Sequence, residues 1–384
     1  ICIVGIIFSK ELVGIVADGF SPEKAALATT LTQIMFPYIL LVALAAVAMG
    51  VLNTKNIFGI PASASTVFNI VSITVGLSLA YWLSGGGWSA PKDKNIIPDG
   101  AAQWAIIGMS IGTLIGGASG LAMQLPSLWR VGFRFSPVIS LADEGVKKVV
   151  ALMTPAILGT SAVQINVLVN TYFVSSIDGA QGWLNYAFRL MQFPIGLFGV
   201  AVGTAAIPVL SRLAAEGKKG EFRDTISSSM NLVFLLTLPS ACGLIVLGEP
   251  IIRLIYERGH FDSLATQMTA TALVGYSVGL TGYAAIKILS PAFYALDDAK
   301  TPMIVALASI VVNFAGCYGL REWFSHYGVT PETPFGYGHV GVALATSLVA
   351  LVNFTALAYL LRRKISRLNG RSILSAFIKI AISS

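Results

Sequence analysis

Two basic residues lie inside long apolar stretches of the chain. Arg189 occurs within Asn185–Pro194, and Lys287 occurs within Tyr283–Leu289. An ionisable residue inside a membrane-spanning segment is the first candidate for a functional site, because its charge is costly in hydrocarbon. No Asp or Glu lies deep in any complete apolar stretch. Since an unpaired cation needs water or an anion, the two residues predict a water-filled, cationic cavity for an anionic substrate.

The two cations differ in chemistry. Arg189 carries an always-charged guanidinium fork that suits phosphate, whereas Lys287 carries a compact point charge. Either side chain could instead extend to the membrane surface and keep its charge in water. That alternative is stronger for Lys287, which lies near the expected end of its apolar stretch.

Three amide side chains complete the set of predicted substrate-binding residues. Gln192 lies in the same stretch as Arg189, while Asn166 and Asn170 lie in the preceding apolar stretch together with Gln164. Asn166 and Asn170 are four residues apart, so they share one face of a helix and could line the cavity. The alternative is that these amides hold neighbouring helices together by hydrogen bonds.

The sequence lacks the motifs of several other kinds of functional site. The sequence contains no P-loop, GxSxG, HExxH or dinucleotide fingerprint, which predicts a protein that is not an enzyme and has no cofactor. A proton relay would use acidic residues or histidines inside the membrane, yet His260, His326 and His339 all lie in expected loops or at their edges. Three cysteines in 384 residues indicate small core residues rather than a disulfide scaffold.

The composition predicts the elements that must hold these residues. Only 11% of the 384 residues are charged, 55% are hydrophobic and the mean hydropathy is +0.78. A soluble globule could not cover so much apolar surface, so the sequence predicts an all-α, polytopic membrane protein. The chain begins without Met and ends within an apolar run, from which we expect a fragment of a longer protein. Eleven apolar stretches are candidate membrane spans, of which the first and the last are incomplete: 1–17, 27–52, 60–84, 102–123, 148–174, 183–211, 225–247, 266–294, 302–320, 339–361 and 372–384.

The connecting loops predict the orientation. Fifteen Lys and Arg residues fall in the even-numbered gaps between these stretches or at their edge, and six fall in the odd-numbered gaps. Cytoplasmic loops carry the excess of Lys and Arg, so the even gaps are predicted to face the cytoplasm. This asymmetry also explains the net charge of +7, and nucleic acid is not predicted as a partner.

Two sequence patterns indicate how the helices are organised. The stretch Gly50–Pro61 resembles Pro291–Pro302 at an offset of 241 residues, which suggests a parallel repeat of six helices. Pro194 and Pro208 interrupt the stretch that carries Arg189, which could be a gating element or a permanent kink. Three consecutive GxxxG steps predict close helix packing, at Gly108, Gly112, Gly116 and Gly120.

Several of these stretches together resemble the MurJ/MviN family of lipid II flippases. The resemblance is carried by Phe36–Leu41 and Gly50–Thr54, by Gln164–Asn166 with Asn170 and Thr171, by Tyr186–Pro194, and by Tyr276–Leu280 with Lys287–Tyr294. It implies two six-helix lobes around a central cavity, with Arg189 as the family's arginine of the eighth helix. On that map, residues 1–135 are the remainder of the N-terminal lobe, 136–365 the C-terminal lobe, and 366–384 the start of an extra helix.

The resemblance also implies the activity and the partners. It implies a multi-pass transporter in the bacterial cytoplasmic membrane that flips lipid II, an undecaprenyl pyrophosphate-linked peptidoglycan precursor, by alternating access. Membrane lipids and cell-wall synthesis enzymes are the other expected partners. Some family members bind sodium, but the matching stretch here offers Asn313 and Cys317 without an acid, so no metal site is predicted. The alternatives are an exporter of other polyprenyl-linked glycans or of drugs, an intramembrane enzyme acting on such a lipid, and a scaffold for cell-wall enzymes.

Overall fold

The fold is helical throughout the part of the chain that the structure describes. The structure is a computed structural model that describes residues 2–85, 100–134, 144–259, 261–331, 333–365, 377–381 and 383. Within these residues there is no strand, and eight helices are long and apolar enough to cross a membrane, or nine if one bent pair counts as a single span. The predicted all-α polytopic membrane protein is therefore confirmed.

The chain forms two compact units, Ile1–Ser140 and Leu141–Ser384. The predicted lobe boundary after residue 135 falls within 135–143, outside the described residues. Most of the expected extra helix at 366–384 also lies outside them, as does His260.

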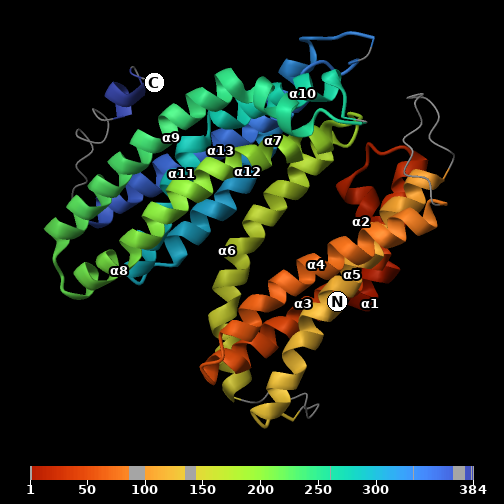
Figure 1. Ribbon diagram of the computed structural model, residues 1–384. Coiled ribbons are helices and arrows are strands. Elements are labelled where there is room, and N and C mark those ends of the chain that lie inside the picture. Colours follow the sequence, from red (N-terminus) through yellow and green to blue (C-terminus); the bar gives the residue numbers. More distant parts are fainter. Residues whose placement is uncertain are drawn as a thin grey trace. The chain divides into compact units, whose positions relative to one another are not determined.

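Unit 1 is built around one glycine-rich helix. Its helices are α1 (Cys2–Ile7), α2 (Ser9–Val16), α3 (Pro22–Thr54), α4 (Gly59–Leu83) and α5 (Ala101–Arg130) (Figure 1). The incomplete first span expected at 1–17 consists of two short helices, α1 and α2, which are separated by Phe8. The glycines of α5 let its backbone touch α4: a Cβ atom on Gly108 would lie 2.6 Å from the Ala80 nitrogen. The predicted role of the GxxxG steps in helix packing is thus confirmed.

Unit 2 contains the helices that carry all five predicted site residues. They are α6 (Glu144–Val174), α7 (Ala180–Pro194), the π-helix η1 (Ile195–Val200), α8 (Ala201–Ala215), α9 (Lys219–Tyr256), α10 (Ser263–Ser277), α11 (Leu280–Ala295), α12 (Lys300–Ser325) and α13 (Gly338–Lys364). Buried apolar side chains form two clusters. One joins α7, α10 and α13 around Met191 and Leu273, and the other joins α8, α9 and α11 around Ile226 and Ile288.

One expected span, 266–294, is broken into α10 and α11, which meet at an angle of 46°. A break frees backbone carbonyl groups that need partners inside a membrane. Ser347 of α13 provides one donor, because its hydroxyl lies 2.7 Å from the carbonyl oxygen of Gly275 and 3.0 Å from that of Tyr276, which also accepts from the Gly279 N–H. A Cβ on Gly279 would lie 2.6 Å from the Ser347 Cα, so only glycine fits beside this serine.

The backbone shows the 241-residue repeat directly. The turn between α3 and α4 and the turn between α11 and α12 contain the two non-glycine residues with positive φ in the described chain, Asn56 (61°) and Asp297 (54°). The hydrogen bonds also correspond: Ile57 N donates to Leu52 O, and Asp298 N donates to Phe293 O, each at 3.0 Å. The last residues of the preceding helices, Thr54 of α3 and Ala295 of α11, differ by the same offset. So do the first residues of the following helices, Gly59 of α4 and Lys300 of α12.

Candidate substrate-binding site

Arg189 lies on the exposed face of α7. The opposite face packs against α10 through buried residues spaced three or four apart, namely Ala180, Leu184, Ala187 and Met191. That spacing turns Asn185, Arg189 and Gln192 to the other side, where all three are exposed. We call this set the α7 polar stripe. Gln192 therefore lies beside Arg189, whereas Asn185 was not among the predicted residues, although its position four residues before Arg189 could have indicated it.

The residue before Arg189 anchors α7 to the broken span. The Phe188 ring meets the rings of Tyr276 and Tyr283 edge-on, with centroid distances of 5.4 Å and 6.4 Å. These contacts fix the rotation of α7 about its axis, so Arg189 is held away from the aromatic cluster. Phe188 thus has a packing role, and no acid of the described chain neutralises Arg189 from that position.

Neither Arg189 nor Lys287 forms a hydrogen bond or ion pair with another described residue. The ion pairs found in the described chain belong to helix ends and loops, as for Arg253 with Glu249 (2.8 Å) and for Lys364 with Asp298 (2.7 Å). Lys287 is exposed on α11, as Arg189 is on α7. Both cations are therefore free to bind an anion or to lie in water.

The helix that carries Arg189 changes its winding just beyond it. Proline lacks an N–H group, so Pro194 cannot complete the regular hydrogen-bond ladder of the helix. The six residues after it, Ile195–Val200, form the π-helix η1 before α8 resumes the α-helix. Short π segments are frequent at functional sites. The predicted interruption is confirmed at Pro194, where it takes the form of a π segment, but not at Pro208, which lies inside the continuous helix α8.

Two glycines join this span to α11. A Cβ on Gly199 would lie 3.0 Å from the Ala284 Cα, and a Cβ on Gly203 would lie 2.5 Å from the carbonyl oxygen of Lys287. From the first contact to the second, the residue number increases in both segments, so α8 and α11 run parallel. Gly203 is fourteen residues beyond Arg189. At 1.5 Å per residue, Arg189 and the Lys287 backbone differ in depth by roughly 20 Å, so the two cations cannot hold the same phosphate group.

Asn166 and Asn170 are bound to neighbouring helices. The Nδ2 group of Asn166 donates to Ser309 Oγ of α12, and that of Asn170 donates to Thr346 Oγ1 of α13, both at 3.0 Å. Asn313 Nδ2 of α12 donates to Asn170 Oδ1 at 2.9 Å, where the Cys317 thiol also donates at 3.4 Å. We call these six residues the α6 seam. Both asparagines therefore join helices by hydrogen bonds, which is the alternative to lining a cavity that the sequence left open.

The α6 seam has no acidic residue. Its groups are amides, hydroxyls and a thiol, and Asn170 Oδ1 already accepts two hydrogen bonds. In the part of the chain that the structure describes, no three His, Cys, Asp or Glu residues gather where they could hold a metal ion. We assign no cation to the seam. Ser309 and Thr346 were missed from the sequence, although polar residues inside apolar stretches are a recognisable signal for such contacts.

The sequence matches one protein family over nearly its whole length. A family model described as "Lipid II flippase MurJ" matches residues 1–383. A lipid II flippase MurJ of Burkholderia cenocepacia is 35% identical over 85% of this chain and 61% of its own length. A probable lipid II flippase MurJ of Buchnera aphidicola subsp. Acyrthosiphon pisum is 33% identical over 94% of this chain and 66% of its own. The chain thus spans less than two thirds of these relatives.

Solved structures share the fold. A structure of lipid II flippase MurJ in an inward closed conformation aligns with a TM-score of 0.75 and 27% identity, and the alignment covers 99% of this chain and 72% of that one. An inward-facing multidrug transporter of the MATE family aligns with a TM-score of 0.72 over 95% of this chain and 77% of that one. At 15% identity, the second likeness shows the fold alone.

Proposed function

The chain belongs to the MurJ family of lipid II flippases, and from this membership we propose that it moves lipid II from the inner to the outer leaflet of the bacterial cytoplasmic membrane. It would do so as a transporter working by alternating access, not as an enzyme. The family supplies the substrate, and the α7 polar stripe supplies the chemistry that can bind it. Unit 1 then corresponds to the remainder of an N-terminal lobe and unit 2 to the C-terminal lobe, while contacts with cell-wall synthesis enzymes stay a prediction.

One observation carries this proposal: Arg189 is exposed and has no acidic partner among the described residues. The substrate's pyrophosphate is its most concentrated charge, and a guanidinium fork can bind two phosphate oxygens at once. Asn185 and Gln192 lie about one turn to either side of Arg189. Their amides can donate hydrogen bonds to the phosphates or to the sugars next to them.

The two cations would then act in succession. If the sorting of loop charges gives the orientation, α7 starts at the external face and α11 ends at the cytoplasmic face. Lys287 lies on the cytoplasmic side of the middle of the Ala180–Ala215 span, and Arg189 on the external side. A pyrophosphate loaded from the cytoplasm would therefore meet Lys287 before it reaches Arg189.

The η1 segment supports a change of shape between these steps. Gly199 and Gly203 fix the end of η1 and α8 to α11, whereas α7 packs on α10 and is separated from α8 by the π-helix. A π segment has weaker hydrogen-bond geometry than an α-helix and lets the chain bend there. We therefore propose that α7 tilts about η1 when the transporter changes its accessible side.

The test is complementation by the full-length protein in cells depleted of their own flippase. The readout is the amount of lipid II exposed on the outer leaflet. We expect wild type to restore exposure, Arg189→Ala to reduce it at least tenfold and Arg189→Lys to restore it in part, because lysine keeps the charge but loses the fork. Each variant's membrane level is measured by immunoblot.

Arg253→Ala is the matched control, because Arg253 is an exposed arginine that pairs with Glu249 and Glu257 at the end of α9. It should leave lipid II exposure unchanged. Full exposure with Arg189→Ala would overturn the assignment of Arg189. Absence of exposure with well-expressed wild type would overturn the function itself.

A further inference from the structure

Tyr186 borders the α7 polar stripe with an aromatic ring. It precedes Arg189 by three residues, so the two side chains are neighbours on the surface of the helix. Tyr186 is 38% exposed, and its hydroxyl forms no hydrogen bond with another described residue. Tyrosines at a membrane surface commonly anchor a helix in lipid. This face of α7 also carries Asn185 and Arg189, however, and such polar groups belong in water rather than in hydrocarbon.

Two further rings hold the Tyr186 ring in place. The centroid of the Tyr256 ring, at the end of α9, lies 4.8 Å from that of Tyr186, and the centroid of the Phe261 ring lies 5.3 Å from it. Tyr256 and Phe261 in turn pack against the buried cluster around Met191 and Leu273. The Tyr186 ring is therefore ordered before a ligand arrives, which reduces the entropy lost on binding.

Asn185 supplies a hydrogen-bond acceptor next to this ring. Its Nδ2 group donates to the carbonyl oxygen of Gln181 at 2.8 Å. Because a carbonyl can only accept, this bond fixes which end of the amide is the NH₂ group. The Oδ1 atom accepts no hydrogen bond from a described residue, and Asn185 is exposed. About one turn of α7 therefore presents a cation, an acceptor, a hydroxyl and an aromatic ring.

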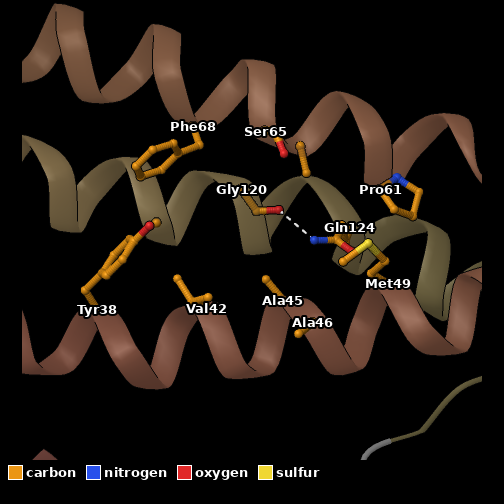
Figure 2. A pocket seen from close by; sticks show the side chains of 12 residues that line it. Tyr38, Val42, Ala45, Ala46, Met49, Pro61, Ser65, Phe68, Gly120 and Gln124 are labelled. Carbon is orange, nitrogen blue, oxygen red and sulfur yellow. Dashed lines mark hydrogen bonds between the residues drawn. The ribbon is translucent and has the colours of Figure 1, made fainter. Parts of the chain in front are cut away.

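The pocket of unit 1 has a different chemistry (Figure 2). It lies between α3, α4 and α5, has a volume of about 220 Å³ and is lined mostly by alanine, glycine and larger apolar side chains. No cation is among the described residues that line it, and the NH₂ group of its amide, Gln124, already donates to the carbonyl oxygen of Gly120 at 3.2 Å. A charged, hydroxylated ligand therefore fits the α7 polar stripe rather than this pocket.

We propose that Tyr186 and Asn185 form a subsite for the sugar that is bonded directly to the substrate's pyrophosphate. This inference rests on the proposed function, in which Arg189 holds the pyrophosphate. The faces of a sugar ring carry C–H groups that pack on an aromatic ring, and its edges carry hydroxyl and amide groups that can donate to Asn185 Oδ1. Tyr186 lies about 4.5 Å from Arg189 along the helix axis. A sugar attached to a phosphate at the guanidinium can therefore reach the ring.

The test measures the affinity of the purified full-length protein for three ligands in detergent. They are lipid II, undecaprenyl pyrophosphate that carries only the first sugar, and undecaprenyl pyrophosphate without a sugar. We expect Tyr186→Ala to weaken binding of the first two roughly tenfold, since it removes a ring contact and a hydroxyl. The affinity for the ligand without a sugar should not change. Tyr186→Phe keeps the ring and should keep most of the affinity.

Three further variants separate the sugar from the phosphates. Asn185→Leu should weaken only the two ligands that carry a sugar, whereas Arg189→Ala should weaken all three. Tyr318→Ala is the matched control, because Tyr318 is an exposed tyrosine on α12 with no ring contact among the described residues, and it should change none.

The outcomes distinguish the subsite from the function on which it rests. If Tyr186→Ala weakens all three ligands equally, or none of them, the subsite is overturned while the role of Arg189 stands. If it weakens lipid II but not the ligand with one sugar, the assignment to the first sugar is overturned. A wild type that binds none of the three would contradict the proposed function itself.

Discussion

At the scale of single residues, the membrane gives polar side chains two different uses in this chain. Arg189 has no partner in the described chain, and it lies on an exposed face. Asn170 is held by three hydrogen bonds to α12 and α13. Both stand out in the sequence for the same reason, as polar residues in apolar stretches. Only the structure separates the residue that is free to bind an anion from the residue that joins helices.

Replacing Asn170 by Leu should destabilise the protein. The change keeps a similar volume but leaves Asn313 Nδ2 and the Thr346 hydroxyl without this partner. We expect a loss of about 1–2 kcal/mol in the free energy of unfolding, since hydrogen bonds between membrane helices contribute modestly. Unfolding in detergent measures the change. Gln164→Leu is the control because Gln164 is exposed on the same helix. Loss of transport by Asn170→Leu with unchanged stability would show that Asn170 binds substrate instead.

Asp298 connects the turn between α11 and α12 to the end of α13. Burial alone would raise the pKa of its carboxyl group, but hydrogen bonds from Lys364 and Thr301 outweigh burial and lower the pKa to about 2. Lys364 Nζ lies 2.7 Å from Oδ2, and the Thr301 backbone N–H donates to Oδ1 at 3.0 Å. The carboxylate therefore stabilises the folded state in its charged form.

The resulting stability should depend on pH. Because the folded pKa lies below the unfolded value, the contribution is complete above about pH 4 and is lost as the pH falls toward 2. At neutral pH, we expect Asp298→Ala to lower the free energy of unfolding by about 1–2 kcal/mol. Asp298→Asn should cost less because its side chain can still accept from Thr301. Thermal unfolding at several pH values measures both, and a difference between wild type and Asp298→Ala that persists at pH 2 would contradict the ion pair.

At the scale of elements, glycine sets which helices can touch. Gly203 brings α8 against the backbone of α11, so Gly203→Ala must push the two helices apart. We expect a loss of about 1–3 kcal/mol in stability, the usual cost of overpacking. Gly196→Ala is the control, because a Cβ there meets nothing within 4 Å. Denaturation of both variants in detergent makes the comparison, and equal stability would show that α8 and α11 can separate freely.

The sequence predicted most of the helices and the interruption at Pro194, but not the break between α10 and α11. Long apolar stretches identify spans because every backbone group in a membrane must be paired locally. The break between α10 and α11 carries no proline, and it depends on Ser347 of another helix, so no local pattern could indicate it. The junction at Phe8 between α1 and α2 was likewise not predicted, since hydropathy alone does not indicate it. Pairings such as Asn170 with Thr346 join residues far apart in the chain, beyond the reach of periodicity.

At the scale of the whole molecule, the repeat conserves the backbone and changes the chemistry. Each unit contains one copy of the repeated turn. The helix before this turn packs on the second helix after the turn: α3 packs on α5, and α11 packs on α13. At the 241-residue offset, Ala46 corresponds to Lys287, and Ile57 corresponds to Asp298. The two halves therefore present different groups on equivalent helices. Unit 1 has the small apolar Ala46 at the position where unit 2 has the cation of Lys287.

The orientation of the chain can be tested with single cysteines in a background without other cysteines. Lys218→Cys lies in an even gap and Tyr327→Cys in an odd gap, and both positions are exposed. The charge sorting predicts that a membrane-impermeant maleimide labels Tyr327→Cys in intact cells and Lys218→Cys only after the membrane is opened. The reverse pattern would invert the order in which a substrate meets Lys287 and Arg189.

The broken span has a consequence for how the protein is made. Helices α10 and α11 contain 15 and 16 residues, so each is about 23 Å long, while the hydrocarbon layer is about 30 Å thick. Neither half can cross the bilayer alone, so the insertion machinery must accept Ser263–Ala295 as one segment. Ser347 is synthesised some fifty residues after Ala295. The carbonyl groups at the break therefore remain without their final donor until α13 emerges from the ribosome and joins the bundle.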